Sequence, residues 1–449
     1  MSVFVRRHVV ASTFASTSRT TTPCVTARGY ASARKMAKNQ VKGGVKESEP
    51  EPERKAGGGK RVGTFMPLSA AQLKHPLTTV PSKLEESPIF SAGALTRTSV
   101  GKVMQFSKPQ NGVLKAYGVP KNLVVEFRVL SSPYSVVRDV TISTAELLEA
   151  ASSKPSSETR AVITGQAGSG KSFLLLQSVE YCVSKGWIVL YVPRAINLVN
   201  SSTPHVYDER TRTYLQPEFT FELLRRFEQV NASAMKQIQI TRPFAKGNKK
   251  LASGAQLSEL IKLGTSDKTL APAVFDAVLH EVARQTQRPV LLAVDDFQAL
   301  YCKTTYRDTQ FQGIKSYHLS LPRVLLEYAG GMRNFAKGAV LGAISNSSTE
   351  YQPCVELREA LGLSHPLPVS PYLRRSPELV AYAKGLRNIA VPDTFQVSEA
   401  AALFNLWGQD HALHHRPTDE VFLTMFTAAS GNPRNFVWRE MLSSLSLSP

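Results

Sequence analysis

Apolar runs alternate with amphipathic segments along the middle of the chain. Four short apolar runs have the length of buried strands: residues 160–164, 187–192, 289–295 and 338–345. Segments with helical apolar spacing lie between them, at residues 173–183, 217–230 and 272–284. This alternation predicts an α/β fold in which helices cover both faces of a parallel sheet. We assign residues 99–370 to this core.

The segment that leads into the core has a different pattern. Between about Val100 and Val140, short apolar runs such as residues 122–130 are broken by Pro120 and Pro133, and they favour strands and turns. Residues 144–151 then favour a short helix with Thr144 as its cap.

The carboxyl-terminal part has only helical spacing. After about Ser370 we expect no further strand. The helical patterns occupy residues 376–386, 397–406, 418–429 and the segment after Pro433. We therefore predict a helical lid domain over residues 371–449.

The amino-terminal residues have the composition of a mitochondrial transit peptide. The first 46 residues contain nine Lys and Arg but no Asp or Glu, and they are rich in Ser, Thr and Ala. We assign residues 1–30 to the transit peptide, with cleavage after Tyr30; the alternative is a basic disordered tail. Residues 31–98 include Lys-rich pieces and Gly57–Gly59, which are typical of a flexible linker. Together they predict a disordered amino-terminal extension.

The charge of the chain indicates a polyanionic neighbour. The formal net charge is +19, and removal of the nine cations of residues 1–46 leaves +10. In the mitochondrial matrix the simplest polyanion is RNA or DNA, although a basic matrix protein without nucleic-acid contact is the alternative. No apolar run is long enough for a membrane-spanning helix. The four Cys residues are too far apart to predict a zinc site.

The segment G-Q-A-G-S-G-K-S fits the phosphate-binding pattern G-x-x-x-x-G-K-[ST], between a predicted strand and a predicted helix. Its glycines allow backbone angles that aim N–H groups at phosphate, and the helix start adds its positive dipole. The Lys171 ammonium would contact the β and γ phosphates, and the Ser172 hydroxyl would bind Mg²⁺. We assign to nucleotide binding Gly165, Gln166, Ala167, Gly168, Ser169, Gly170, Lys171, Ser172 and Phe173.

Two further strands end in polar residues. Asp295 follows the apolar run 290–294 and is predicted, with Ser172, to hold the magnesium ion. Asp296 stands where related ATPases carry a Glu that polarises the attacking water, so we expect weak or absent hydrolysis. Alternatively, Asp296 caps the following helix. Asn346, after the last predicted core strand, is a candidate for contact with the γ phosphate or the water.

The Gly-Asn-Pro-Arg segment at residues 431–434 places Arg434 at the start of the last helix, from which its guanidinium could reach a phosphate; a surface Arg is the alternative. The order of the loop, the Asp pair, Asn346 and Arg434 resembles the AAA+ branch of P-loop NTPases, a core with a helical lid.

More narrowly, the chain resembles the death-associated-protein family of GTP-binding proteins of the mitochondrial small ribosomal subunit, over roughly residues 100–445. The resemblance is carried by Tyr117–Pro120, Gly165–Ser172, Trp187–Pro193 with Asn197–Val199, Gln216–Pro217 and Asp295–Asp296. It implies a structural protein in the matrix ribosome, in contact with neighbouring small-subunit proteins, with rRNA and with a bridge to the large subunit.

The resemblance implies GTP or GDP with Mg²⁺ in the loop. The N-K-x-D motif with which small GTPases read guanine is represented only by Asn248-Lys249-Lys250-Leu251. Guanine therefore rests on the family, and the motifs equally allow ATP. The rival interpretation is an active AAA+ ATPase of the matrix that acts on protein or DNA.

Overall fold

The computed structural model describes residues 87–106, 112–247, 249–366, 368–413 and 416–442. The predicted transit peptide and most of the predicted linker lie outside these residues. Among the described residues, no helix combines the length and apolar content required to cross a bilayer.

A five-stranded parallel sheet forms the centre of the described chain. Its order from edge to edge is β13 (Arg387–Ala390), β3 (Arg160–Thr164), β12 (Gly338–Ala343), β9 (Val290–Asp295) and β4 (Ile188–Val192). The prediction of four apolar core strands is thereby confirmed. β12, β9 and β4 are buried along their whole length because helices cover the sheet, which accounts for their continuous apolar sequences.

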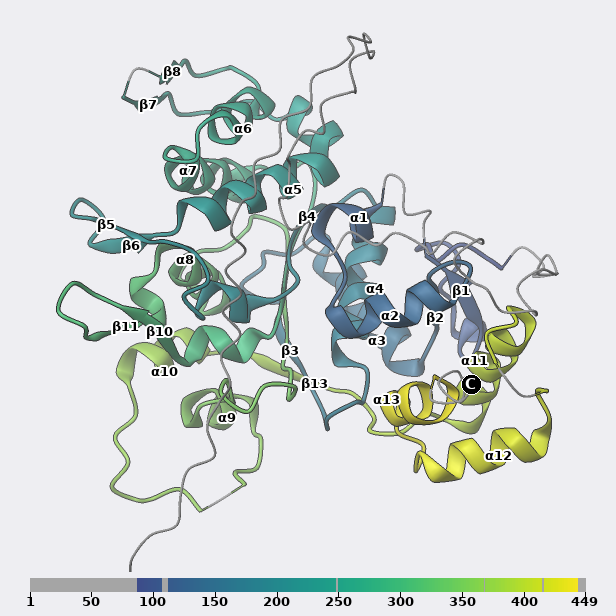
Figure 1. Cartoon of the computed structure of the whole chain (residues 1–449). Helices are drawn as coiled ribbons and strands as arrows, with labels where there is room; N and C mark the ends of the chain where they lie inside the picture. The colour runs from purple at the N-terminus through teal and green to yellow at the C-terminus, as the bar shows by residue number, and fades with distance from the viewer. Residues whose placement is uncertain (1–86, 107–111, 248, 367, 414–415, 443–449) are drawn as a thin grey trace, which may run out of the picture. The chain divides into compact units, whose positions relative to one another are not determined.

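Helices cover both sides of this sheet. Figure 1 shows α3 (Asp139–Ala151) and α4 (Lys171–Ser184) on one side, and α7 (Ala271–Arg284) and α8 (Ser320–Ala329) on the other. α6 (Leu257–Ser266) packs against α7 and the long α5 (Pro217–Gln237). The predicted α/β class, a parallel sheet covered on two faces, is confirmed.

Smaller elements that the pattern did not predict join the core. One is the short helix α9 (Val355–Leu361), whereas α10 (Pro377–Ala383) confirms the helix predicted at residues 376–386. Three antiparallel hairpins are β5 (Val206–Asp208) with β6 (Thr213–Leu215), β7 (Phe244–Lys246) with β8 (Lys249–Leu251), and β10 (Lys303–Arg307) with β11 (Gly313–Lys315).

The strand predicted at residues 122–130 is a helix. The elements of this region are β1 (Val103–Gln105), α1 (Val113–Tyr117), α2 (Lys121–Val129) and β2 (Tyr134–Val136). The buried residues Val124, Phe127 and Leu130 are three apart, which is helical spacing, whereas the prediction considered only a short apolar run between two prolines.

The helix predicted from Thr144 begins five residues earlier, at Asp139. Thr144 lies inside α3, where its Oγ1 donates to the Val140 carbonyl at 2.7 Å, so it is not a cap.

The prediction that strands end near Ser370 is also wrong. β13 pairs in parallel with β3, with Arg387 opposite Ala161 and Ala390 opposite Thr164. This edge strand has only one neighbour and is largely exposed, so its sequence, R-N-I-A, carries no apolar run by which it could be recognised. The helical part of the chain therefore starts at about Val397.

The carboxyl-terminal helices have a hydrophobic core of their own. α11 (Val397–Gln409), α12 (Asp419–Ala428), α13 (Pro433–Asn435) and a π-helical turn (Phe436–Met441) confirm the predicted helices. Phe404, Trp407, Phe422 and Phe436 form this core together with Tyr134 of β2. The lid is thus packed on the segment that precedes the sheet.

The described part of the chain begins inside the span expected to be linker. Phe90 is buried, and its ring lies 5.4 Å from that of Phe106. Residues from about Pro88 onward therefore belong to the core.

Glu126 of α2 gives a first testable prediction, because it joins the lid to the core. Its Oε1 accepts a hydrogen bond from Trp438 Nε1 at 2.7 Å, and burial raises the pKa of the carboxyl to about 7. A raised pKa means that the stabilisation is present below the ordinary value and is lost as the pH rises through about 7. This carboxyl should lower the free energy of unfolding by on the order of 1 kcal/mol between pH 5 and pH 8, and Glu126→Gln should make the total fall smaller by that amount.

Urea unfolding followed by tryptophan fluorescence measures both values. Glu420→Gln, at an exposed position of α12, is the control and should keep the wild-type pH dependence. An unchanged pH dependence in Glu126→Gln would contradict the assignment.

Candidate nucleotide-binding site

The predicted phosphate-binding loop connects β3 to α4. Gly165, Gly168 and Gly170 adopt φ values of 147°, 85° and 97°, which L side chains rarely allow. Gly170 immediately precedes α4, so the free N–H groups of the helix start face the loop. The sequence prediction of a strand, a glycine loop and a helix is met at each position.

Lys171 is held inside the loop. Its Nζ donates to the carbonyl oxygens of Gly165 at 2.9 Å and Gln166 at 2.5 Å, and the side chain is buried. Burial lowers the pKa of Lys171 to about 8, while the charges of Asp393 and Asp295 oppose that shift. Because the Lys171 ammonium donates to two carbonyls, its third proton can donate to an anion bound in the loop.

Ser172 and Asp295 meet across the sheet edge, although 123 positions separate them in sequence. Ser172 Oγ donates to Asp295 Oδ1 at 2.9 Å, and the same oxygen accepts the Asp296 N–H at 3.0 Å. Burial and the neighbouring Asp296 charge raise the pKa of the Asp295 carboxyl. The two residues assigned to a metal ion are therefore adjacent.

Asp296 does not cap the following turn with its side chain. Its backbone has φ 55°, an uncommon left-handed conformation, and its side chain makes no capping bond to the 3-10 helix Phe297–Tyr301. Its carboxylate instead lies 3.9 Å from Arg194 Nε. This arrangement disfavours the capping alternative.

At the end of β12, the backbone of Ser345, and not Asn346, makes the hydrogen bonds to the neighbouring residue Gln298. Gln298, which is fully buried, donates to the Ser345 carbonyl at 2.9 Å and accepts the Ser345 N–H at 3.1 Å. Asn346 follows as an exposed residue at this edge. Its predicted γ-phosphate contact stays a prediction.

The segment after β13 and the turn before α13 lie against the loop. Asp393 Oδ1 accepts the Gln166 N–H at 3.0 Å, and Asn432 Nδ2 donates to the Ala167 carbonyl at 3.1 Å. The Arg434 N–H donates to the Gly168 carbonyl at 3.1 Å, while its side chain is exposed. A Cβ added at Gly168 would come within 2.5 Å of Asn432 Oδ1, so only glycine permits this approach.

Phe173, assigned to nucleotide binding, has a packing role for its ring. The ring lies 5.9 Å from that of Phe106 and 6.2 Å from that of Phe127. Any contact of Phe173 with a phosphate is therefore left to its backbone N–H.

Arg138 joins the loop to the carboxyl-terminal helices, and sequence reasoning missed it. Its guanidinium donates to the Ser169 carbonyl at 2.8 Å and to the carbonyls of Pro392 at 3.1 Å and Thr394 at 2.9 Å. Its Nε lies 3.3 Å from Oε2 of Glu399 on α11, and both side chains are buried. One cation thus holds the loop, the segment after β13 and α11.

The residues present fit a magnesium-bound polyphosphate. Ser169 Oγ and Tyr191 Oη are buried and make no hydrogen bond within the described part of the chain, so each has capacity for a ligand or its water. Two adjacent buried carboxylates, Asp295 and Asp296, favour a cation beside them. Lys171 and the loop N–H groups, in the same loop region, offer positive charge to the phosphates.

Comparison with known proteins shows to which family the chain belongs. Residues 135–438, more than half of the chain, match the family described as mitochondrial ribosomal death-associated protein 3. The chain belongs to this family. The mitochondrial localisation predicted from the amino-terminal composition, in the matrix, is thereby confirmed.

Curated relatives agree with the family. The chain is 24% identical over 383 residues to the small ribosomal subunit protein mS29 of Schizosaccharomyces pombe, covering 83% of this chain and 78% of the relative. It is 25% identical to the Neurospora crassa protein of that name, over 68% of this chain and 66% of the relative. The Bos taurus protein is 23% identical over 57% of this chain and 64% of the relative.

Arg138, Asp393 and Tyr191 show what the sequence left hidden in this member of the death-associated-protein family. Arg138 and Asp393 belong to no motif whose spacing would mark them. Tyr191 belongs to a segment that carried the family resemblance, so a signal was present, but its pattern indicated only a strand.

The Arg138 ion pair generates the second prediction. Arg138→Met leaves the buried Glu399 carboxylate without its cation, so the free energy of unfolding should fall by about 3 kcal/mol. Arg97→Met is the matched control, because Arg97 pairs with Glu146 on the surface, and its cost should stay below about 1 kcal/mol. Urea denaturation of the two variants measures both free energies of unfolding. Equal losses in the two variants would contradict the role of the Arg138–Glu399 ion pair.

Proposed function

We propose that this protein is a structural component of the mitochondrial small ribosomal subunit that holds a guanine nucleotide with Mg²⁺ in the loop at residues 165–172. Membership of a mitochondrial ribosomal family and three relatives named as small ribosomal subunit proteins support the ribosomal role. Following the resemblance, we extend the proposal to contacts with neighbouring small-subunit proteins, with rRNA and with a bridge to the large subunit.

The contact between Ser172 and Asp295 is the observation that carries the nucleotide proposal. Their oxygens lie 2.9 Å apart, and the buried Lys171, next to Ser172 in sequence, donates to the Gly165 and Gln166 carbonyls of the same loop. A hydroxyl and a carboxylate are ligands that Mg²⁺ prefers, and the loop amides with Lys171 would hold the phosphates. When bound, the metal ion would neutralise phosphate charge.

The choice of guanine rests on the family resemblance. Lys249–Leu251, the remnant of an N-K-x-D pattern, forms strand β8 of a hairpin that packs near α6, away from the loop (Figure 1). Guanine would therefore be selected by other residues, and ATP is the competing ligand in any binding assay.

Holding the nucleotide is favoured over hydrolysing it. The Asp296 carboxylate is shorter than a Glu by one methylene, and Arg194 lies 3.9 Å from it, so its charge is partly engaged. An active AAA+ ATPase of the matrix is the rival, and it is not favoured because the relatives are ribosomal proteins. A bound nucleotide would instead stabilise the folded protein by mass action.

Lys171→Ala provides the third prediction. The full-length variant should lose nucleotide binding by at least about a hundredfold, since the phosphate charge loses its buried cation. The same variant should enter small subunits less well. Lys185→Ala, at the far end of α4, is the control.

Two measurements test this proposal. Isothermal titration with GTP and with ATP, each with Mg²⁺, gives affinity and base preference. Sedimentation of mitochondrial lysate gives assembly, with comigration of the wild type with the small subunit as the expected result. A variant without nucleotide that still assembles normally would refute the structural role of the nucleotide, and a free hexameric ATPase would refute the ribosomal role.

A further inference from the structure

The hairpin of β7 and β8 carries an unbalanced positive charge. Residues 242–250 contain Arg242, Lys246, Lys249 and Lys250 but no Asp or Glu. In the described chain, no ion pair engages Arg242, Lys246 or Lys250. The pKa of Asp267 is lowered mainly by hydrogen bonds from Thr269 and, to a smaller extent, by the positive charge of Lys249. The hairpin therefore has cations without counterions of its own.

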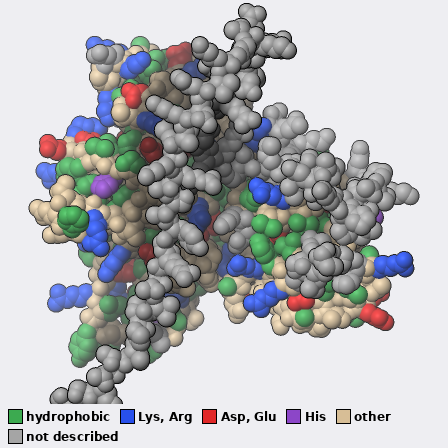
Figure 2. Space-filling model, in the orientation of Figure 1, with side chains coloured by type: hydrophobic (Ala, Val, Ile, Leu, Met, Phe, Trp, Pro, Cys, Tyr) green, Lys and Arg blue, Asp and Glu red, His purple; other side chains and the backbone are tan. Residues whose placement is uncertain are grey.

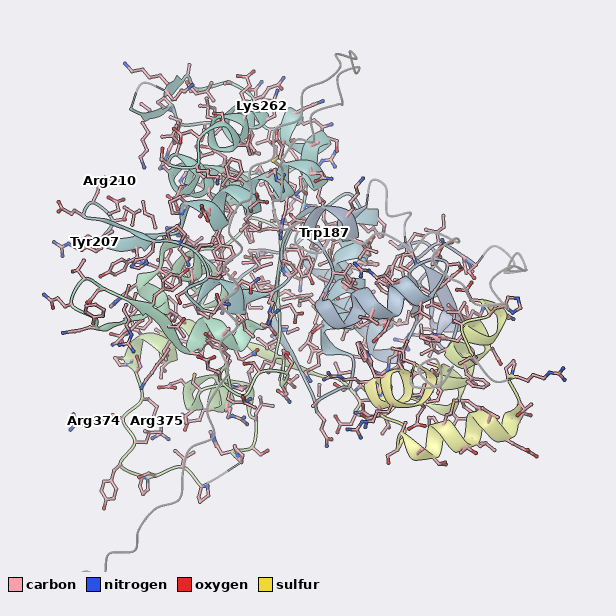
Figure 3. All side chains as sticks on the ribbon, in the orientation of Figure 1. Trp187, Tyr207, Arg210, Lys262, Arg374 and Arg375 are labelled. Atoms are coloured by element: carbon pink, nitrogen blue, oxygen red, sulfur yellow. The ribbon has the colours of Figure 1, made fainter. Side chains whose placement is uncertain are left out.

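A second hairpin on the same protein gives the contrast. In β5–β6, Arg210 and Arg212 are accompanied by Asp208 and Glu209, so that hairpin is neutral. Figure 3 labels Arg210 there and Lys262 on α6, next to the basic hairpin. Figure 2 shows Lys and Arg side chains at the upper left, where Figure 1 draws β7 and β8.

The strand register places like charges face to face. Lys246 is the direct partner of Lys249, and Lys250 is opposite Ala245 on the other face of the ribbon. Like charges directly opposite each other destabilise a hairpin, so a free β7–β8 hairpin bears a cost that an anion would remove. Lys246 and Lys249 share the face of Phe244 and Leu251, which pack against the core, whereas Lys250 lies on the other face.

The base of this hairpin is rigidly fixed to the core. The buried Glu281 of α7 accepts the Thr241 N–H at 3.0 Å and the Arg242 N–H at 3.4 Å. Ile240 is buried and exchanges backbone hydrogen bonds with Ala255 and Gly254. Phe244 and Leu251, a cross-strand pair, pack against the main core. These contacts anchor the base of the hairpin to the core.

We infer that the β7–β8 hairpin binds RNA through its phosphate groups, with Lys246, Lys249 and Lys250 as the contact residues. Three Lys residues within five positions concentrate positive charge at the end of the hairpin. The closely spaced phosphates of RNA are the counterions that such a cluster matches. The exposed Lys236, at the end of α5, and Lys262 extend the positive surface around the hairpin base. This inference rests on the proposed ribosomal function and names the surface that RNA contacts.

Charge reversal tests the RNA contact and is our fourth prediction. In the full-length protein, Lys246→Glu with Lys250→Glu should weaken binding to an in vitro transcript of the small-subunit rRNA by about tenfold or more at about 100 mM KCl. The slope of log affinity against log salt should decrease in magnitude by about 1.4 to 1.8, because two phosphate contacts are lost. Filter binding over a KCl series measures both quantities.

The matched control carries the same change of charge at exposed positions elsewhere, Arg210→Glu with Arg374→Glu, and should bind as the wild type does. Misfolding is separated from lost contact, because Glu at position 246 faces Lys249 as an attractive pair, so the melting temperature should not fall. The milder Lys246→Gln with Lys250→Gln should give an intermediate loss.

Three outcomes would overturn the inference: unchanged affinity in the hairpin variant, equal losses in hairpin and control variants, or tighter binding of the hairpin to poly-glutamate than to RNA. Sedimentation with the small subunit distinguishes this from failure of the proposed function. A wild-type protein that enters the small subunit, with a hairpin variant that binds rRNA normally, refutes only the hairpin contact; a wild type absent from the small subunit refutes the ribosomal role.

Discussion

All five strands of the central sheet run in the same direction, so every connection that leaves a strand leaves it at one edge. The loop after β3, Asp295 at the end of β9 and Ser345 after β12 are brought together by this constraint. Because β12 lies between β3 and β9, its end faces both the loop and the acidic pair. Reversal of a single strand would move one of these groups to the opposite edge.

The same edge also receives the carboxyl-terminal part of the chain. β13 delivers Asp393 to the Gln166 N–H, and Arg138 joins Ser169 to Glu399 of α11. Binding of a ligand to the loop and packing of the last helices on the core therefore depend on shared contacts. Free energy of ligand binding and free energy of lid packing are coupled wherever contacts are shared in this way. The stabilising role that we propose for a bound nucleotide would act through that coupling.

The basic hairpin stands on different elements from the loop. It is fixed by Glu281 of α7, on the side of the sheet opposite α4 (Figure 1). The nucleotide site and the RNA surface that we propose can therefore change independently in variants. The chain is basic even without its first 46 residues. The β7–β8 hairpin is one place on the folded protein where this positive charge is found.

The sequence by itself determined the features whose chemistry is local. Gly165 to Ser172 is contiguous, and the buried core strands have apolar runs, so motif and periodicity predicted the sheet and the loop. The pattern failed where the environment of a segment decides its state. Residues 122–130 form a helix although they are a short apolar run between two prolines, and β13 is an edge strand without an apolar run. Only the tertiary structure could reveal Arg138, because its partners Ser169, Pro392 and Glu399 lie 31 to about 260 positions away. Contacts at such separations leave no periodic trace in a sequence, since the chain brings them together only when the core is packed.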